Sequence, residues 1–296
     1  MRVLLLTPPM TQLNTPYPAT AYLTGFLRKN GVEAFQADPA IQLVLRLLSR
    51  PGLDKIRQSL KGRKAGAKAS SVQSFLAQFD RYSATVPAAI RFLQGKDPSL
   101  ALRIVGREFL PEGPRFEALS ELQKTSDDPI AWAFGALGIQ DQAKYLASLY
   151  VDDLADVIRE GIDPRFELSR YGEKLAASQA TFDPLSAALE EKKPTLVDLE
   201  LDAITAELLD KHRPDVVCLT APFPGNVYGA FRIAREVRRL SPGTKLVLGG
   251  GYVNTELRSL AEPRVFDYFD FLTLDDGERP LICLLEHLAG KRPASK

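Results

Sequence analysis

Four short loops hold the residues most able to bind a ligand, and each loop follows a predicted strand. Thr7 to Pro18 offers hydroxyls and amides but no charge, and Ala221 to Asn226 is uncharged and contains two prolines. Residues 249–251 are three consecutive glycines, and Asp275 to Glu278 carries three acids around a glycine. The first loop suits a large, mostly uncharged ligand. We therefore predict a binding crevice and assign no acid-base catalyst.

Each loop also has a purely structural explanation. A rigid turn would account for the first loop, Asn226 can cap the helix that follows it, and acids are favoured at the start of a helix. Three adjacent glycines cost backbone entropy, and a common reason to keep them is the close approach of a ligand to the main chain. The four loops together indicate a site more strongly than any one of them does.

The elements that must position these loops alternate along the chain. Arg2 to Thr7 is a continuous apolar run closed by two prolines, which is typical of a strand buried on both faces of a parallel sheet. The pattern further predicts strands over 32–37, 215–220, 245–248 and 269–274, and helices over 21–31, 197–212 and 227–240, near Thr255, and up to about Leu288. Strands that alternate with helices indicate an α/β fold with a five-stranded, parallel, doubly wound sheet. In such sheets, ligands bind beyond the carboxyl ends of the strands, where the four loops would meet.

The segment 39–196 has few strand signals and is expected to be a helical insertion after the second strand. Its clearest helix runs from Asp141 to Gly161. We predict an α/β domain made of 1–38 and 197–290, with 291–296 as a tail or the start of a linker. Lys55 to Lys68 holds six basic residues and no acid, which fits either a solvated connection or a docking surface.

Composition narrows the class of protein. The 296 residues are 45% apolar and 25% charged, which is the usage of a globular protein. With 38 basic and 37 acidic residues, the net charge of +1 gives no reason to expect a nucleic-acid partner. The two cysteines, Cys218 and Cys283, support neither a disulfide framework nor a cysteine-rich metal site. No apolar run is long enough to span a membrane, so we expect a cytoplasmic protein without a membrane partner.

Common nucleotide-binding motifs are missing. No G-x-G-x-x-G follows the first strand, and no G-x-x-x-x-G-K-[ST] occurs in the chain. The acid that a receiver-type phosphoacceptor domain needs after its first strand is also absent.

The blocks Leu4 to Pro9, Thr220 to Asn226, Gly249 to Leu257 and Leu274 to Glu278 resemble, in this order, the N-terminal cobalamin-binding region of cobalamin-dependent radical S-adenosylmethionine enzymes. The resemblance covers about 1–38 and 197–290. It implies a flavodoxin-like or Rossmann-like domain with the corrinoid over the carboxyl ends of the strands. The expected cofactor-binding residues are Pro9, Thr11, Gln12, Asn14, Tyr17, Thr220, Pro222, Phe223, Asn226, Gly249, Gly250, Gly251, Tyr252, Asp276 and Glu278.

Two departures from related proteins shape the expected function. Many cobalamin domains carry D-x-H-x-x-G after strand one, whereas the two histidines of this chain, His212 and His287, lie elsewhere. We therefore expect cobalamin to be held without a histidine lower ligand. Two distant cysteines cannot hold the [4Fe-4S] cluster of a radical enzyme. The cluster and S-adenosylmethionine are expected only in a radical catalytic domain, joined in cis in a larger enzyme or acting in trans as a partner subunit.

Two other functions remain open at this stage. One is a Rossmann-like enzyme that acts on a sugar nucleotide or similar small substrate, with Asp275, Asp276 or Glu278 catalytic. The other is a degenerate domain that keeps the sheet as an interaction platform and binds no cofactor. In the cobalamin interpretation, the complete system would carry out methyl transfer or a related radical modification.

Overall fold

The computed structural model describes the chain except for residues 12–16, 62–68, 120–137, 178–180, 260 and 294–296. It forms two compact units. The first contains residues 1–43, 168–194 and 198–296, and the second contains 44–167 and 195–197.

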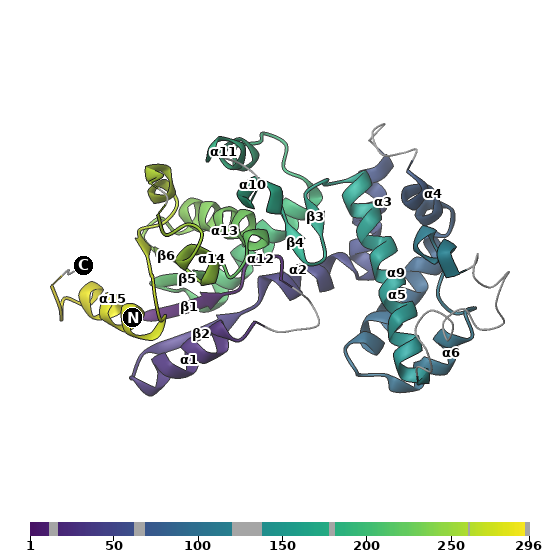
Figure 1. Ribbon diagram of the computed structural model, residues 1–296, viewed down its shortest axis with the longest axis horizontal. Helices are drawn as coiled ribbons and strands as arrows, with labels where there is room; N and C mark the ends of the chain where they lie inside the picture. The colour runs from purple at the N-terminus through teal and green to yellow at the C-terminus, as the bar shows by residue number, and fades with distance from the viewer. Residues whose placement is uncertain (12–16, 62–68, 120–137, 178–180, 260, 294–296) are drawn as a thin grey trace. The chain divides into compact units, whose positions relative to one another are not determined.

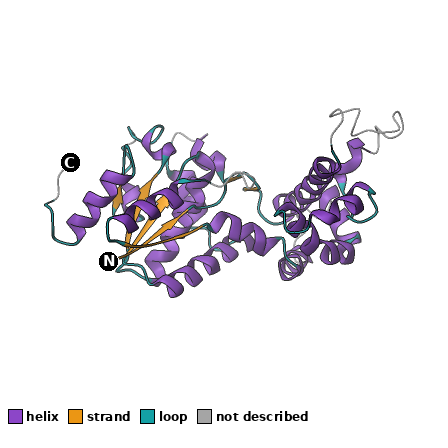
Figure 2. Cartoon of the chain, turned by 90° about the horizontal axis from the view of Figure 1, so that it is seen from below, coloured by secondary structure: helices purple, strands orange, loops and turns teal. Residues whose placement is uncertain are grey.

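The first unit is built on a five-stranded sheet, drawn in orange in Figure 2. Its strands are β1 (Arg2–Leu6), β2 (Glu33–Ala37), β5 (Val216–Thr220), β6 (Lys245–Gly249) and β7 (Phe271–Leu272). The order is β2-β1-β5-β6-β7, and every neighbouring pair is parallel. The predicted α/β doubly wound fold with a helical insertion after the second strand is therefore confirmed. The order reverses between β1 and β5, so the topological switch point lies at the carboxyl ends of these two strands.

Helices cover both faces of this sheet. Helix α1 (Ala19–Lys29) and helix α15 (Glu278–Leu288) pack on one face, and α13 (Val227–Leu240) lies on the opposite side of the sheet from α1 (Figure 1). Alternate strand residues point to the same face. The core beneath α1 and α15 therefore combines side chains from one face of β1, β2, β5 and β6 with side chains from the two helices: Val3, Leu5, Ala34, Val216, Cys218, Val247, Leu27, Leu281 and Leu285.

Helix α12 (Leu196–His212) leads into β5. His212, its last residue, has its ring centroid 4.8 Å from that of Phe35 on β2. The shorter elements of this unit are β4 (Arg170–Tyr171), α10 (Glu173–Ala177), α11 (Asp183–Leu189), η3 (Pro224–Asn226), α14 (Gly251–Asn254) and η4 (Pro263–Asp267).

The last strand is shorter than the predicted 269–274. Strand β7 pairs with β6 only at Phe271 and Leu272. One residue earlier, the carboxylate of Asp270 accepts the backbone N–H of Leu246 at 2.8 Å and pairs with Arg238 and Lys245. A side chain thus takes the bond that a strand carbonyl accepts in a regular ladder. The N–H of Asp270 still donates to the carbonyl of Leu246 at 2.8 Å, but residues of β7 pair in register with β6 only at Phe271 and Leu272.

The second unit is helical. It contains α3 (Arg50–Lys61), α4 (Ser70–Ala77), α5 (Phe79–Leu93), α6 (Ala101–Val105) and α9 (Ile139–Gly161), with the short elements η1 (Pro98–Leu100), η2 (Pro114–Phe116) and β3 (Phe166–Glu167). Helix α2 (Pro39–Leu47) begins in the first unit and ends in the second. Tyr82 and Tyr150 stack in the core of the second unit with ring centroids 5.4 Å apart. Of the basic segment 55–68, residues 55–61 belong to α3 and 62–68 lie outside the described residues.

Among the residues that the structure describes, no helix is both long enough and apolar enough to cross a lipid bilayer.

Candidate functional site

A cavity of about 230 Å³ opens at the carboxyl ends of the strands in the first unit. It lies at the switch point between β1 and β5 and extends under α1 and α15. Six of the residues predicted from the sequence line it: Tyr17, Thr220, Gly249, Gly250, Gly251 and Glu278. The cavity therefore stands where a doubly wound sheet places its ligand. It brings together residues from three of the four predicted loops and Thr220 at the end of β5, whereas no residue of the loop Ala221 to Asn226 lines it.

The inner end of the cavity is apolar. Leu5, Cys218 and Val247 line it from three adjacent strands, and Leu23 and Leu281 line it from α1 and α15. All five residues belong to the core under these two helices or pack against it. Burial raises the pKa of the Cys218 thiol to about 12, so the side chain is a neutral thiol at physiological pH.

The three glycines form a corner that only bare backbone can make. Gly250 has a φ of +111°, and a Cβ at this position would lie 2.6 Å from the backbone nitrogen of Ala221. A Cβ on Gly249 would collide with the hydroxyl of Thr273. Ala221 also donates its N–H to the carbonyl of Gly249 at 2.7 Å. The protein's own chain thus accounts for the missing side chains of Gly249 and Gly250, while these glycines also border the cavity.

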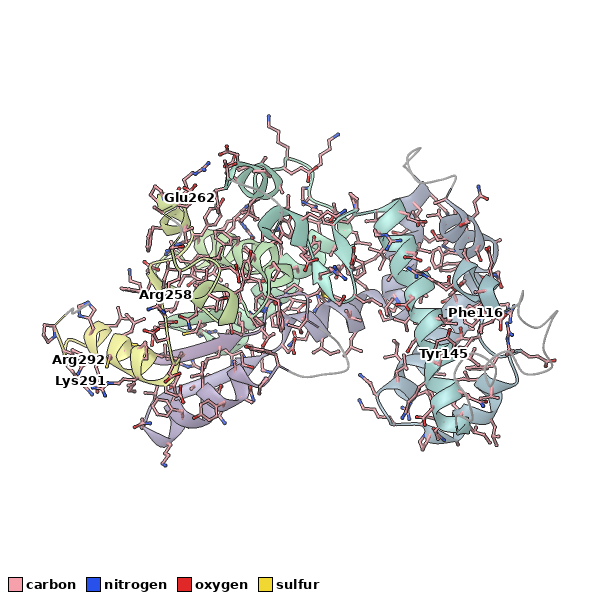
Figure 3. All side chains as sticks on the ribbon, viewed as in Figure 1. Phe116, Tyr145, Arg258, Glu262, Lys291 and Arg292 are labelled. Carbon is pink, nitrogen blue, oxygen red and sulfur yellow. The ribbon has the colours of Figure 1, made fainter. Side chains whose placement is uncertain are left out.

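The rim of the cavity carries carboxylates. A hydrogen bond from the Tyr22 hydroxyl lowers the pKa of Glu278, the first residue of α15. Arg258, labelled in Figure 3, lies 2.5 Å from Asp275 and lowers the pKa of that carboxyl. Both acids are therefore ionised at neutral pH. No lysine or arginine is among the described residues that line the cavity.

Asn254 holds this rim in place. Its side-chain oxygen accepts the backbone N–H of Asp275 at 2.9 Å and the Arg258 guanidinium at 2.9 Å. Asp275 adopts a φ of +65°, a conformation that aspartate tolerates better than most residues. Asn254 thus binds the backbone N–H of Asp275 and Arg258 binds its carboxylate, and these two contacts hold the turn after β7.

Asn226 joins the first two loops. The side chain is fully buried and donates its Nδ2 to the carbonyl of Pro8 at 2.7 Å. It makes no side-chain capping bond to α13, and its Oδ1 has no hydrogen-bond partner in the described structure. A buried acceptor without a partner is unusual in a folded protein. Because Asn226 is not among the residues that line the cavity, a ligand in the cavity would not reach this atom.

Other predicted residues lie around the cavity and do not line it. Phe223 is 55% exposed, and its ring meets that of Tyr17 edge-on at 6.1 Å. Pro9 packs against Gly229, and Thr11 is buried. The contact between Pro9 and Gly229 places the start of the first loop against α13.

Of the remaining predicted residues, Pro222 has its carbonyl oxygen 3.4 Å from the position that a Cβ on Gly251 would take, and the hydroxyl of Tyr252 donates to the carbonyl of Ala176 at 3.3 Å. Asp276 is exposed and is not among the residues that line the cavity. Gln12 and Asn14 lie outside the described residues.

Sequence reasoning missed several lining residues. Tyr22, Leu23 and Thr20 come from α1, and Thr273 and Asn254 flank the last loops. Tyr22 is 62% exposed, but this exposure is visible only in the structure and left no signal in the sequence. Cys218 has the appearance of an ordinary core residue, and nothing in the sequence marks it as lining a cavity.

Neither histidine lines the cavity. His212 packs on Phe35, and His287 contacts the carbonyl of Arg292 at 3.1 Å. The described residues contain no group of three or more histidine, cysteine or acidic side chains placed to hold a metal ion.

Searches of protein-family models, curated proteins and solved structures returned no match to this chain.

Proposed function

We propose that the first unit binds cobalamin, with the end of the nucleotide tail in the cavity and the corrin ring outside it, over the carboxyl ends of the strands. The observation that carries the proposal is the cavity's place at the topological switch point, with an apolar interior under α1 and α15. Its volume of about 230 Å³ is below the roughly 300 to 1,000 Å³ of pockets that enclose a whole drug-sized ligand. The cavity therefore suits one end of a larger molecule.

The residues present fit such a ligand in two respects. An apolar interior accepts an aromatic base, and a cavity of roughly 150 Å³ already holds benzene in an engineered protein, so about 230 Å³ has room for more than one ring. The amide arms around a corrin ring are N–H donors, and the oxygens of Thr220, Thr273 and Glu278, which line the cavity, can accept hydrogen bonds from them. Tyr17, Phe223 and the glycine corner would border the ring and the entrance of the tail.

The chemistry of the complete system would come from the cofactor. Bound cobalamin supplies a cobalt centre that carries a methyl group or changes oxidation state. This chain's residues would bind and orient the corrinoid without a histidine on the lower side of cobalt, because both histidines lie elsewhere. A radical S-adenosylmethionine domain, in cis or in trans, would hold the [4Fe-4S] cluster and S-adenosylmethionine and complete a methyl transfer or related reaction.

A sugar-nucleotide enzyme has less support. A pyrophosphate carries two negative charges and is usually met by basic side chains or by a glycine-rich helix start. The described lining instead presents Asp275 and Glu278 and no basic residue. These charges disfavour a diphosphate more than they disfavour cobalamin, whose single phosphodiester is balanced within the cofactor by cobalt.

Retention of hydroxocobalamin tests the proposal. Purified protein is mixed with the vitamin, separated by gel filtration and scanned across the visible range. Cobalamin binding predicts a corrinoid spectrum in the protein fraction at close to one equivalent. A protein fraction without visible absorbance, together with stabilisation of the fold by a sugar nucleotide, would favour the enzyme instead.

A further inference from the structure

The inner end of the cavity offers a ligand no hydrogen-bond partner other than a thiol. Its side chains are those of Leu5, Leu23, Cys218, Val247 and Leu281. A thiol is only a weak donor and acceptor. Any group that reaches this end of the cavity is therefore surrounded almost entirely by hydrocarbon.

The backbone at the inner end is already engaged. Leu5 pairs with Gln36 on one side and Cys218 on the other, and Cys218 pairs in turn with Val247. These pairs lie inside parallel ladders, whose N–H and C=O groups bond to one another. On the helix side, the N–H of Leu281 donates to the carbonyl of Gly277 at 3.2 Å. The main chain therefore has little to offer a polar ligand atom.

Polar groups lie instead toward the rim. Thr220 ends β5, Thr273 follows β7, and Glu278 begins α15. The hydroxyl of Thr20 on α1 lies at the same level, 3.5 Å from that of Thr7, which follows β1. A ligand can satisfy its polar atoms at this level and needs an apolar group below it. Burying an amine or ring nitrogen without a partner costs enough free energy to lower affinity about tenfold or more.

We infer that the inner end selects the base of the ligand's tail: it accepts a fused aromatic base with few hydrogen-bonding groups, such as dimethylbenzimidazole, and rejects a purine with an exocyclic amine. The inference rests on the proposed function and adds to it the chemical class of the group that enters the cavity. Val247 and Cys218 are the residues that set this preference.

Three corrinoids test the preference by equilibrium titration followed in the visible spectrum: cobalamin, its analogue with adenine as the base, and cobinamide, which has no base. We expect cobalamin to bind at least about tenfold tighter than each of the other two. The adenine analogue loses affinity because its polar atoms stay unpaired, and cobinamide because it leaves the apolar end empty.

Two matched variants test whether the preference for the base arises at the inner end of the cavity. Val247→Thr is nearly isosteric and places a hydroxyl at the inner end, so it should narrow the ratio between cobalamin and the adenine analogue. Val253→Thr makes the same change at a buried residue of α14 that does not line the cavity, and it should leave the ratio unchanged.

The possible results distinguish the preference for the base from cobalamin binding itself. Equal affinity for cobalamin and for either analogue overturns the base preference while cobalamin binding stands. An unchanged ratio in folded Val247→Thr, with far-ultraviolet circular dichroism as the check of folding, overturns the assignment to the inner end. Failure of all three corrinoids to bind overturns the proposed function and the preference together.

Discussion

Cys218 on β5 and Val247 on β6 are direct partners in the parallel ladder, and both side chains line the inner end of the cavity. They also belong to the core packed beneath α1 and α15. The cavity is thus a space that core side chains leave open near the carboxyl ends of the strands. Its shape depends on a few strand residues whose side chains can be made larger or smaller by substitution.

Filling the cavity should weaken cobalamin binding without unfolding the protein. Val247→Phe places a ring in the inner end, where open space limits the change in the free energy of unfolding to about 1.5 kcal/mol. We expect hydroxocobalamin affinity to fall at least tenfold, as measured by titration. Leu272→Phe on β7, which does not line the cavity, is the control and should bind as the unmodified protein does. Full affinity in Val247→Phe would exclude the cavity as the site.

Cys218 should react slowly with alkylating agents, at a rate that follows pH. With a pKa of about 12, roughly one thiol in 10⁴ is ionised at pH 8, and the thiolate fraction rises tenfold for each pH unit up to about 12. In a Cys283→Ser variant, Cys218 is the remaining thiol, and iodoacetamide labelling followed by mass spectrometry gives the rate. We expect that rate to climb from pH 7 to 10 without a plateau and to fall when cobalamin is added. A plateau near pH 8.5 would show an ordinary exposed thiol.

The glycine corner should tolerate no side chain at Gly250. Gly250→Ala forces alanine to a φ of +111° and drives its Cβ into the backbone of Ala221, so we expect the free energy of unfolding to fall by at least about 2 kcal/mol in urea denaturation. Gly243→Ala is the matched control, because nothing lies within 4 Å of its Cβ position. It should change stability by less than about 0.5 kcal/mol. Equal effects of the two changes would contradict the described corner.

Asn226 should be needed for stability because its amide holds the first loop. Asn226→Asp keeps the shape but replaces the donor to the Pro8 carbonyl with a buried carboxylate, at an expected cost of about 2 kcal/mol or more at pH 7. Asn30→Asp makes the same chemical change at an exposed site, where Nδ2 donates to Phe26, and should cost less than about 1 kcal/mol. Thermal unfolding of both variants measures the difference. A stable Asn226→Asp protein would mean that the Pro8 contact contributes little.

Much of the sheet could be predicted because its strands are short apolar runs separated by helical segments. The run Arg2 to Leu6 and the run Val216 to Thr220 are buried on both faces, which leaves a continuous apolar pattern in the sequence. The last strand was predicted too long because its local pattern does not reveal that Asp270 binds the Leu246 amide from another strand. That contact depends on register, which the sequence of one segment does not specify.

The rim of the site was partly predictable and its interior was not. Prolines, glycines and acids after strands point to a crevice, and Tyr17, Thr220, Glu278 and the three glycines do line the cavity. Leu5, Cys218 and Val247 have the pattern of ordinary core residues. Whether the space beside them is filled depends on how closely α1 and α15 approach the sheet, which is a property of packing between distant segments.

The most direct test of the account is a cobalamin titration of the unmodified protein and Val247→Phe side by side, with binding followed by the corrinoid absorbance. We predict saturation near one cobalamin per chain for the unmodified protein and at least a tenfold weaker curve for the folded variant. Identical curves, or no change in absorbance with the unmodified protein at any concentration, would contradict the claim that this cavity receives the tail of a corrinoid.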